Sequence, residues 1–480
     1  MLYCIWKKER VEVIYVKEAF GSAALKMAYK YLDSNPEKNA PRLMSMVDRL
    51  DADDSMKGQR SVVRHALEDR QGIWYKLLLS LWDDIDPGVR RALFCNFVIN
   101  ATVFGGQRQL ALQKEHGCNI PWAILMDPTS ACNLRCVGCW SAEYGNRMNM
   151  SLDTMDRVVQ QGKELGVYFY VLSGGEPLVR KKDVIALCER HPDCFFTAFT
   201  NGTLIDEDFA DEILRVKNFA PAISIEGFEE ATDSRRGGGT YRSVIRAMEI
   251  LKRKKLLFGA SSCYTSRNTE SIGSEAFFDA MIEAGAKFIW LFTYMPVGAE
   301  AATELMVSPE QREFMYRQVR AFRETKPIFT MDFWNDGEFT KGCIAGGRRY
   351  LHINAGGDIE PCAFIHYADT SIYTHTLLEA LKSPLFMQYH EGQPFNENHL
   401  RPCPLLDNPE ALARMVDASG AISTDMIAPE DVHILSAKCQ KAAEAWAVAA
   451  DRLWEEKQNC DACGACAVRS STDKTVSIGA

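Results

Sequence analysis

Three cysteines stand close together in the first third of the chain. They are Cys132, Cys136 and Cys139, spaced C-x3-C-x2-C, in the segment from Asp127 to Trp140. Thiolates are soft ligands that select iron–sulfur clusters, zinc or copper(I). Three such ligands hold a four-iron cluster and leave one iron open, as substrate chemistry requires. A zinc site is the alternative, but it more often closes with a fourth Cys or His, and none follows at regular spacing.

The chain has 16 cysteines in all, and their spacing separates the candidates from the rest. A second set is widely spaced, and four ligands suffice for one closed cluster. A third set has the spacing C-x2-C-x2-C. Three interpretations are open for it: it holds a cluster, it binds metal adventitiously, or it binds nothing. The second set is Cys343, Cys362, Cys403 and Cys439, with zinc or free thiols as alternatives; the third is Cys460, Cys463 and Cys466. The isolated cysteines, Cys4, Cys95, Cys118, Cys188, Cys194 and Cys263, are predicted to be core thiols.

Composition narrows the class of protein. The 480 residues are 47% hydrophobic and 25% charged, as in a globular enzyme with a large core. The net charge of −9 argues against nucleic-acid binding. The first residues lack the pattern of a signal peptide, and no stretch is apolar enough for a transmembrane segment. We expect a cytoplasmic protein, where cysteines serve metal or redox chemistry more often than disulfides.

Strand-length apolar runs alternate with helical segments after residue 120. Six βα units of this kind predict an α/β fold, a partial (βα)6 TIM-like barrel, with chemistry at the carboxyl ends of its strands. The predicted strands are Trp122–Met126, Val167–Leu172, Phe195–Phe199, Ala222–Ile225, Leu256–Ser262 and Phe288–Phe292, with Phe329–Phe333 as a possible seventh. The predicted helices are 152–165, 181–190, 206–217, 241–254, 273–284 and Pro309–Arg323.

The flanks of this barrel differ in composition. Residues 1–118 form an N-terminal helical region, with helices predicted at Phe20–Leu32 and at Val89–Phe104. The barrel core takes residues 119–325. A cysteine-rich C-terminal extension follows over residues 326–446, and residues 447–480 hold a helix end and a cysteine-containing tail.

Further motifs follow successive strands in order. Ser173-Gly174-Gly175-Glu176-Pro177 follows the second strand, and Thr200-Asn201-Gly202 follows the third. Ser224-Ile225-Glu226-Gly227 follows the fourth, with Arg236-Gly237 after it, and Met295-Pro296-Val297-Gly298 follows the sixth. Together with C-x3-C-x2-C, this order resembles the radical S-adenosylmethionine (radical SAM) superfamily over about residues 120–300.

The resemblance implies a [4Fe-4S] cluster at Cys132, Cys136 and Cys139 and S-adenosyl-L-methionine as cofactor. Reductive cleavage of that cofactor yields a 5′-deoxyadenosyl radical, which abstracts hydrogen from a substrate. Glu226 stands where the family has Asp. The implied cofactor-binding residues are Gly174, Gly175, Glu176, Pro177, Asn201, Ser224, Glu226, Arg236 and Pro296; the catalytic residues are not identified. Polar residues after the possible seventh strand are candidates to line the substrate cavity, with a structural role as the alternative: Asp332, Trp334, Asn335 and Asp336.

The second cysteine set resembles the SPASM or twitch extension, which implies one auxiliary iron–sulfur cluster. That extension favours peptide or protein modification; a lipid or small metabolite is the alternative substrate. The implied electron donor is a cellular reductant such as flavodoxin or ferredoxin. Two other function classes are open: an electron-transfer protein without catalysis, which would not need the four motifs that follow the strands, and a zinc-stabilised structural or regulatory protein.

Overall fold

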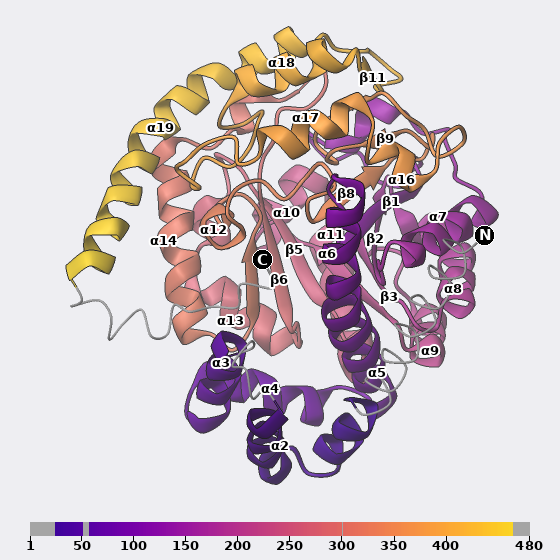
Figure 1. The fold of residues 1–480 in the computed structure, drawn as a ribbon, viewed down its shortest axis with the longest axis vertical. Coiled ribbons are helices and arrows are strands. Elements are labelled where there is room, and N and C mark those ends of the chain that lie inside the picture. Colours follow the sequence, from indigo (N-terminus) through magenta and orange to yellow (C-terminus); the bar gives the residue numbers. More distant parts are fainter. Residues whose placement is uncertain (1–24, 51–56, 300, 464–480) are drawn as a thin grey trace, which may run out of the picture.

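The computed structural model describes residues 25–50, 57–299 and 301–463. Most of its helices surround one large sheet (Figure 1). In the order β7-β6-β5-β4-β3-β2-β1-β8-β9, neighbouring strands are paired, and among the described residues no pairing joins β7 to β9. The strands are β1 (Ala123–Thr129), β2 (Phe169–Gly174), β3 (Phe195–Thr200), β4 (Phe219–Ser224), β5 (Gly259–Tyr264), β6 (Phe288–Thr293), β7 (Phe329–Asp332), β8 (Tyr350–Ile353) and β9 (Ile359–Glu360).

The pairing of β1 through β7 is parallel throughout, and each of the seven overlaps a strand predicted from the sequence. The predicted α/β class, with a sheet that is not closed, is confirmed. Four of the connecting helices, α7, α9, α13 and α14, begin with side-chain caps at Ser151, Asp206, Ser274 and Ser308. The connecting helices are α7 (Leu152–Glu164), α8 (Lys181–Arg190), α9 (Glu207–Val216), α10 (Glu229–Arg236), α11 (Thr240–Arg253), α12 (Thr269–Ile272), α13 (Glu275–Ala284) and α14 (Pro309–Thr325), with short turns η2 (Trp140–Tyr144), η3 (Pro177–Arg180) and η4 (Thr303–Leu305).

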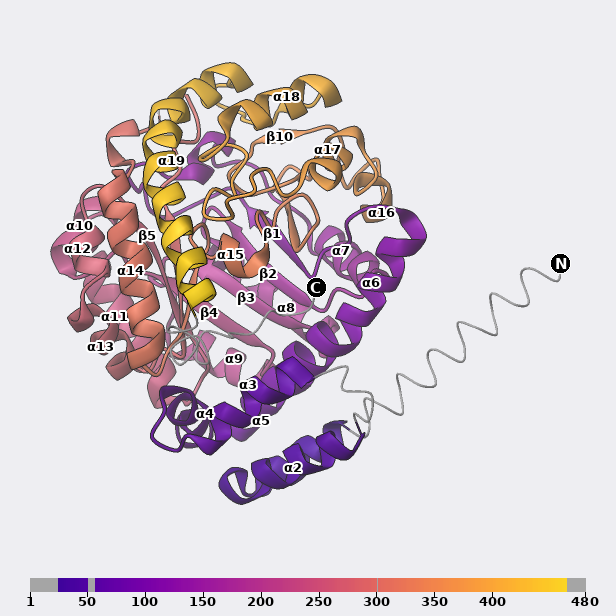
Figure 2. The same cartoon turned by 60° about the vertical axis from the view of Figure 1, so that its left-hand side comes forward.

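The sheet extends into the cysteine-rich region. Strand β8 pairs parallel with β1, and β9 pairs antiparallel with β8; neither strand was expected from the sequence. The rest of this region is irregular, as expected, and ends in a long helix that lies beside α14 (Figure 2). Its elements are α15 (Gly337–Thr340), β10 (Tyr367–Ala368), α16 (Leu377–Ala380), α17 (Pro384–Gly392), α18 (Pro409–Ser419), β11 (Ile422–Ser423) and α19 (Val432–Cys463).

The N-terminal helices lie at the amino ends of the strands (Figure 1). Residues 25–34 are helical, and the start of the predicted Phe20–Leu32 helix lies outside the described residues. The predicted Val89–Phe104 helix continues from α5 into η1, which has π-helical geometry. The helices are α2 (Pro36–Leu50), α3 (Lys57–Glu68), α4 (Ile73–Asp84), α5 (Pro87–Ala92), η1 (Leu93–Phe104) and α6 (Gly105–His116).

One aromatic side chain joins this helical layer to the sheet. The ring of Phe97, in η1, meets the rings of Trp122, Phe169 and Phe195 edge-on at centroid distances of 5.4, 5.0 and 5.8 Å. Phe169 and Phe195 are the first residues of β2 and β3, so η1 covers the amino end of the sheet. No helix in the described ranges is both long and apolar enough to cross a bilayer.

Replacing Phe97 with alanine tests this contact. We expect Phe97→Ala to lower the free energy of unfolding by roughly 2–4 kcal/mol, since it removes three aromatic contacts and leaves a cavity. Val98→Ala is the matched control on the same helix, because Val98 is 37% exposed. Denaturant melts followed by circular dichroism measure both; equal losses in the two variants would contradict the assigned role of Phe97.

Candidate active site

The first cysteine set lies on the loop between β1 and η2, at the carboxyl end of the sheet. Cys132 is exposed, whereas Cys136 and Cys139 are half-buried. Gly138 has a φ of 64°, and a Cβ there would stand 2.6 Å from the Tyr294 ring. Glycine is therefore required for the loop to pack against the segment that follows β6.

The glycines after β2 allow a second close approach. The Gly175 N–H donates to the Thr129 carbonyl at 2.9 Å, and the Glu176 N–H donates to the Ala131 carbonyl at 2.9 Å. A Cβ on Gly175 would stand 2.3 Å from the Ala131 oxygen. The loop of residues 173–177 consequently lies directly against the cysteine loop, and a larger residue at Gly175 would push the two apart.

Glu176 lies where the loops after β1, β2 and β3 meet. Its buried carboxylate accepts hydrogen bonds from the Leu178 N–H (2.9 Å), the Thr200 hydroxyl (2.7 Å) and the Asn201 N–H (2.7 Å). The Asn201 amide in turn donates to the Asn133 side chain at 2.8 Å, beside Cys132. Within the protein, Glu176 thus positions the loops after β2 and β3, and Pro177 begins the short helix η3.

Glu226 lies buried after β4 and pairs with two arginines. One oxygen accepts from Arg235 and from the Nε of Arg236, each at 2.8 Å, and the other accepts from the Cys263 N–H at 3.0 Å. Burial raises the pKa of Glu226, but the two guanidinium groups outweigh it and leave the pKa below its ordinary value. The carboxylate is therefore charged, and the trio carries a net positive charge.

Arg236 also reaches the cysteine loop, with its Nη1 3.9 Å from the Cys136 sulfur. Ser224, the last residue of β4, and Pro296, in the segment after β6, are buried at the same end of the sheet. All nine predicted cofactor-binding residues therefore follow, or end, strands of one sheet. The sequence had not indicated that Glu226 and Arg236 pair with each other.

A buried chain of charged groups was not identified from the sequence. His352 on β8 places Nε2 3.0 Å from an Asp127 oxygen and Nδ1 2.6 Å from a Glu360 oxygen. Burial lowers the pKa of His352, but the two carboxylates outweigh it and raise the pKa to about 10. Tyr144 donates to Glu360 at 2.7 Å, and the Trp140 ring lies 5.7 Å from the His352 ring. This chain connects the cysteine loop to the β8–β9 hairpin.

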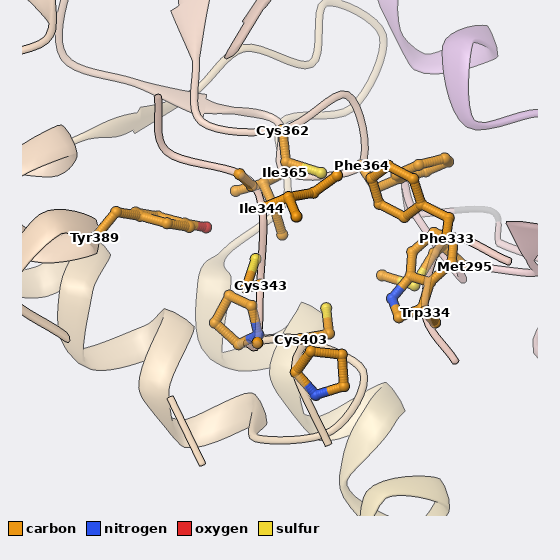
Figure 3. Close-up of a pocket in the computed structure, with 14 residues that line it drawn as sticks. Met295, Phe333, Trp334, Cys343, Ile344, Cys362, Phe364, Ile365, Tyr389 and Cys403 are labelled. Atoms are coloured by element: carbon orange, nitrogen blue, oxygen red, sulfur yellow. The ribbon is translucent and has the colours of Figure 1, made fainter. Parts of the chain in front are cut away.

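A cavity with three of the second-set cysteines in its lining opens beside Cys362, two residues after β9 (Figure 3). The sulfurs of Cys343, Cys362 and Cys403 point toward the same space. About 450 Å³ there is free of protein atoms, part of it open to solvent. The other lining residues are uncharged: Met295, Phe333, Trp334, Gly342, Ile344, Ala345, Phe364, Ile365, Tyr389, Pro402 and Pro404.

Hydrogen bonds to sulfur distinguish this cavity from an ordinary core. The Cys403 sulfur accepts from the backbone N–H groups of Leu405 (3.4 Å) and Leu406 (3.3 Å), and the Tyr350 hydroxyl lies 2.8 Å from the Cys362 sulfur. Burial raises the pKa of Cys343 to about 12. Such thiols are neutral unless a metal or cluster replaces the proton.

The fourth member of that set does not line the cavity. Cys439 is fully buried on α19 and is absent from the cavity lining. Helix α19 includes Cys460 and Cys463, whose side chains are not described, and Cys466 lies outside the described residues. Within the described part of the chain, no three His, Cys, Asp or Glu side chains are grouped as ligands of one metal ion. A cluster places its cysteines farther apart, because each sulfur binds a different iron.

Known proteins resemble this chain in sequence and in fold. Residues 126–262 match the Radical SAM superfamily. An AdoMet-dependent heme synthase of Methanosarcina barkeri is 24% identical over 277 residues, 52% of this chain and 78% of that protein. Mycofactocin maturase MftC of Mycobacterium ulcerans is 27% identical over 307 residues, which are 59% of this chain and 81% of that protein. Streptococcus suis SuiB bound to precursor peptide SuiA shares the fold, with a TM-score of 0.51 and 18% identity over 62% of this chain and 75% of SuiB.

The charge chain through His352 makes a prediction about pH. His352→Gln should lower the free energy of unfolding by about 3–5 kcal/mol at pH 7.5, since Asp127 and Glu360 then lie buried without a cation. At pH 10.5 the loss should be smaller, because His352 in the unmodified protein has then lost its own proton and no longer supplies the cation.

The control for this prediction is His375→Gln, which changes a histidine in an exposed contact with Thr374. It should alter stability by less than about 0.5 kcal/mol. In the unmodified protein the raised pKa means that His352 contributes fully below its ordinary pKa of 6.5 and loses that contribution as the pH rises through about 10. Denaturant melts at the two pH values measure the effect, and equal losses at both would contradict it.

Proposed function

Since this chain is a radical SAM enzyme, we propose that it holds a [4Fe-4S] cluster at Cys132, Cys136 and Cys139 and modifies a peptide. When bound, the cluster and S-adenosyl-L-methionine supply a 5′-deoxyadenosyl radical, which abstracts hydrogen from an unactivated carbon. The observation that carries the proposal is the meeting of the β1, β2, β3, β4 and β6 loops around one three-cysteine segment.

The residues around the cysteines fit such a group. Cys132 is exposed and accepts a hydrogen bond from the Leu134 N–H at 3.4 Å, as a thiolate ligand does. The positive trio of Glu226, Arg235 and Arg236 lies beside Cys136 and suits both an anionic cluster and a cofactor carboxylate. Gly174 and Gly175, whose backbone contacts the cofactor in this proposal, pack directly against residues 127–131, which lead into the cysteine loop. In this proposal Glu176, Pro177, Asn201, Ser224, Glu226, Arg236 and Pro296 complete the cofactor site.

The peptide substrate is supported by related proteins. The relative from Mycobacterium ulcerans is a mycofactocin maturase, and SuiB was crystallised with a precursor peptide. The heme synthase relative keeps a small-molecule substrate as the second candidate. In both cases the electron comes from a cellular reductant such as flavodoxin or ferredoxin.

We further propose one auxiliary iron–sulfur cluster at Cys343, Cys362 and Cys403, with Cys439 as the fourth ligand. Three convergent sulfurs, an uncharged lining and two backbone donors to Cys403 support it. The domain division at residues 118, 325 and 446 belongs to this proposal, with β8 and β9 as the part of the extension that completes the sheet.

Loss of one cysteine tests the primary site. Cys136→Ala should lower the formation of 5′-deoxyadenosine by at least about a hundredfold, because the cluster loses one of three protein ligands. The assay uses the anaerobically reconstituted enzyme with dithionite and S-adenosyl-L-methionine. Cys188→Ala, a core thiol on α8, should keep nearly the full rate. A Cys136→Ala enzyme as active as the unmodified protein would refute the site.

Iron content tests the auxiliary site. Replacing both Cys343 and Cys403 with alanine should remove about four irons per chain, while the signal of the primary cluster remains. Iron analysis and electron paramagnetic resonance measure this, with Cys118→Ala as the buried control. Unchanged iron content in the double variant would exclude the auxiliary cluster at these residues.

A further inference from the structure

Aromatic side chains meet across the inner face of the curved sheet. The Phe199 ring, on β3, lies 5.1 Å from the Trp290 ring and 5.4 Å from the Phe292 ring, both on β6. Strands β4 and β5 separate β3 from β6 in the sheet. Side chains of strands so far apart in the sheet make contact only where it curves, so these rings point into its concave side.

This concave side is not filled by side chains. Along β6 burial alternates: Trp290 and Phe292 are half-buried, whereas Ile289 and Leu291 on the opposite face have no exposed surface. The intervening strands carry small residues on the same face, among them Ala222, which pairs with both Phe199 and Gly259. Large rings opposite small residues leave ring surface open to a ligand.

The same aromatic surface continues to both cysteine sets. Phe292 lies 5.5 Å from Phe333 and 6.2 Å from Phe364, and Phe364 lies 5.1 Å from Trp334. Phe333, Trp334 and Phe364 line the cavity of the second cysteine set (Figure 3). The Phe364 ring also lies 5.7 Å from the ring of Trp140, next to Cys139. We call Phe199, Trp290, Phe292, Phe333, Trp334 and Phe364 the aromatic wall.

The charged groups beside this region, the trio at Cys136 and the His352 chain beside Trp140, are paired with groups of opposite charge. Glu226, Arg235 and Arg236 are paired with one another at the cysteine loop. None of the 14 side chains that line the cavity is charged. A charged group brought against the wall would lose its hydration and gain no partner, whereas an apolar group would gain contact with ring faces.

We propose that the part of the aromatic wall formed by Phe199, Trp290 and Phe292, outside the cavity assigned to the auxiliary cluster, receives an apolar side chain of the peptide, which makes an aliphatic or aromatic residue the one presented to the radical. This inference rests on the proposed function and adds the substrate class. Trp290 and Phe292 are specificity-determining residues in it, because they come from the middle of the wall and bridge β3 to the cavity.

Photo-crosslinking of the reconstituted holoenzyme tests the wall without relying on turnover. The probes are two peptides, acetyl-Gly-X-Gly-amide, in which X is a diazirine analogue of leucine or of lysine. We expect the leucine probe to label tryptic peptides that contain wall residues at least about tenfold more than the lysine probe. A diazirine fatty acid serves as the lipid probe and should not compete.

Two substitutions make this test specific. Phe292→Glu should lower labelling by the leucine probe at least about tenfold, whereas Phe292→Leu keeps the surface apolar and should hold labelling within about threefold. Tyr373→Ala, at a residue 54% exposed on the C-terminal region, is the control and should leave labelling unchanged.

Three results would overturn the inference: equal labelling by the lysine probe, unchanged labelling of Phe292→Glu, or displacement of the peptide by the fatty acid. The last result would assign the wall to an acyl chain. The formation of 5′-deoxyadenosine is measured on the same samples. If 5′-deoxyadenosine forms but any of these three labelling results is found, only the assignment of the aromatic wall is wrong. If no 5′-deoxyadenosine forms, the proposed function is wrong.

Discussion

Parallel pairing of β1 to β6 is the constraint on which the site depends. Parallel strands that run in register end at one edge of a sheet, so loops from five strands meet there although they are spread over residues 129–298. Residues 130–139, which carry the cysteines, contain no helix or strand, and Gly175 and Glu176 join β2 to η3. These loops are held by their neighbours: Glu176 accepts hydrogen bonds from the β3 loop, and Arg236, from the segment after β4, contacts Cys136.

The two-residue period of the strands gives the sheet two different faces. On the outer face, Tyr170 of β2 donates to the Val159 carbonyl of α7, and a Cβ on Gly162 of that helix would stand 2.2 Å from the Tyr170 hydroxyl. The helix and the strand are therefore in direct contact there, with no room for a larger side chain at Gly162. On the inner face, ring surface on β6 stays partly open. One alternating pattern therefore both stabilises the fold and leaves room for chemistry.

The sequence predicted those parts that depend on local pattern. Strand positions followed from apolar runs, and the loop motifs followed from their order after the strands. It did not predict contacts between distant residues: Asp127 meets His352 from 225 positions away, and no local signal links them. The β8–β9 hairpin had a signal, since His352 and Asn354 alternate with apolar residues before Gly356-Gly357, but the irregular surroundings obscured it.

The position of Phe97 has a consequence for how ligands enter and leave the curved sheet. Because η1 packs against the first residues of β2 and β3, it covers the amino end of these strands, while the cysteine loop lies at their carboxyl end. A ligand that enters along these strands from the carboxyl end therefore passes the cysteine loop first. On that route, the deeper of two ligands binds before the shallower one and leaves after it.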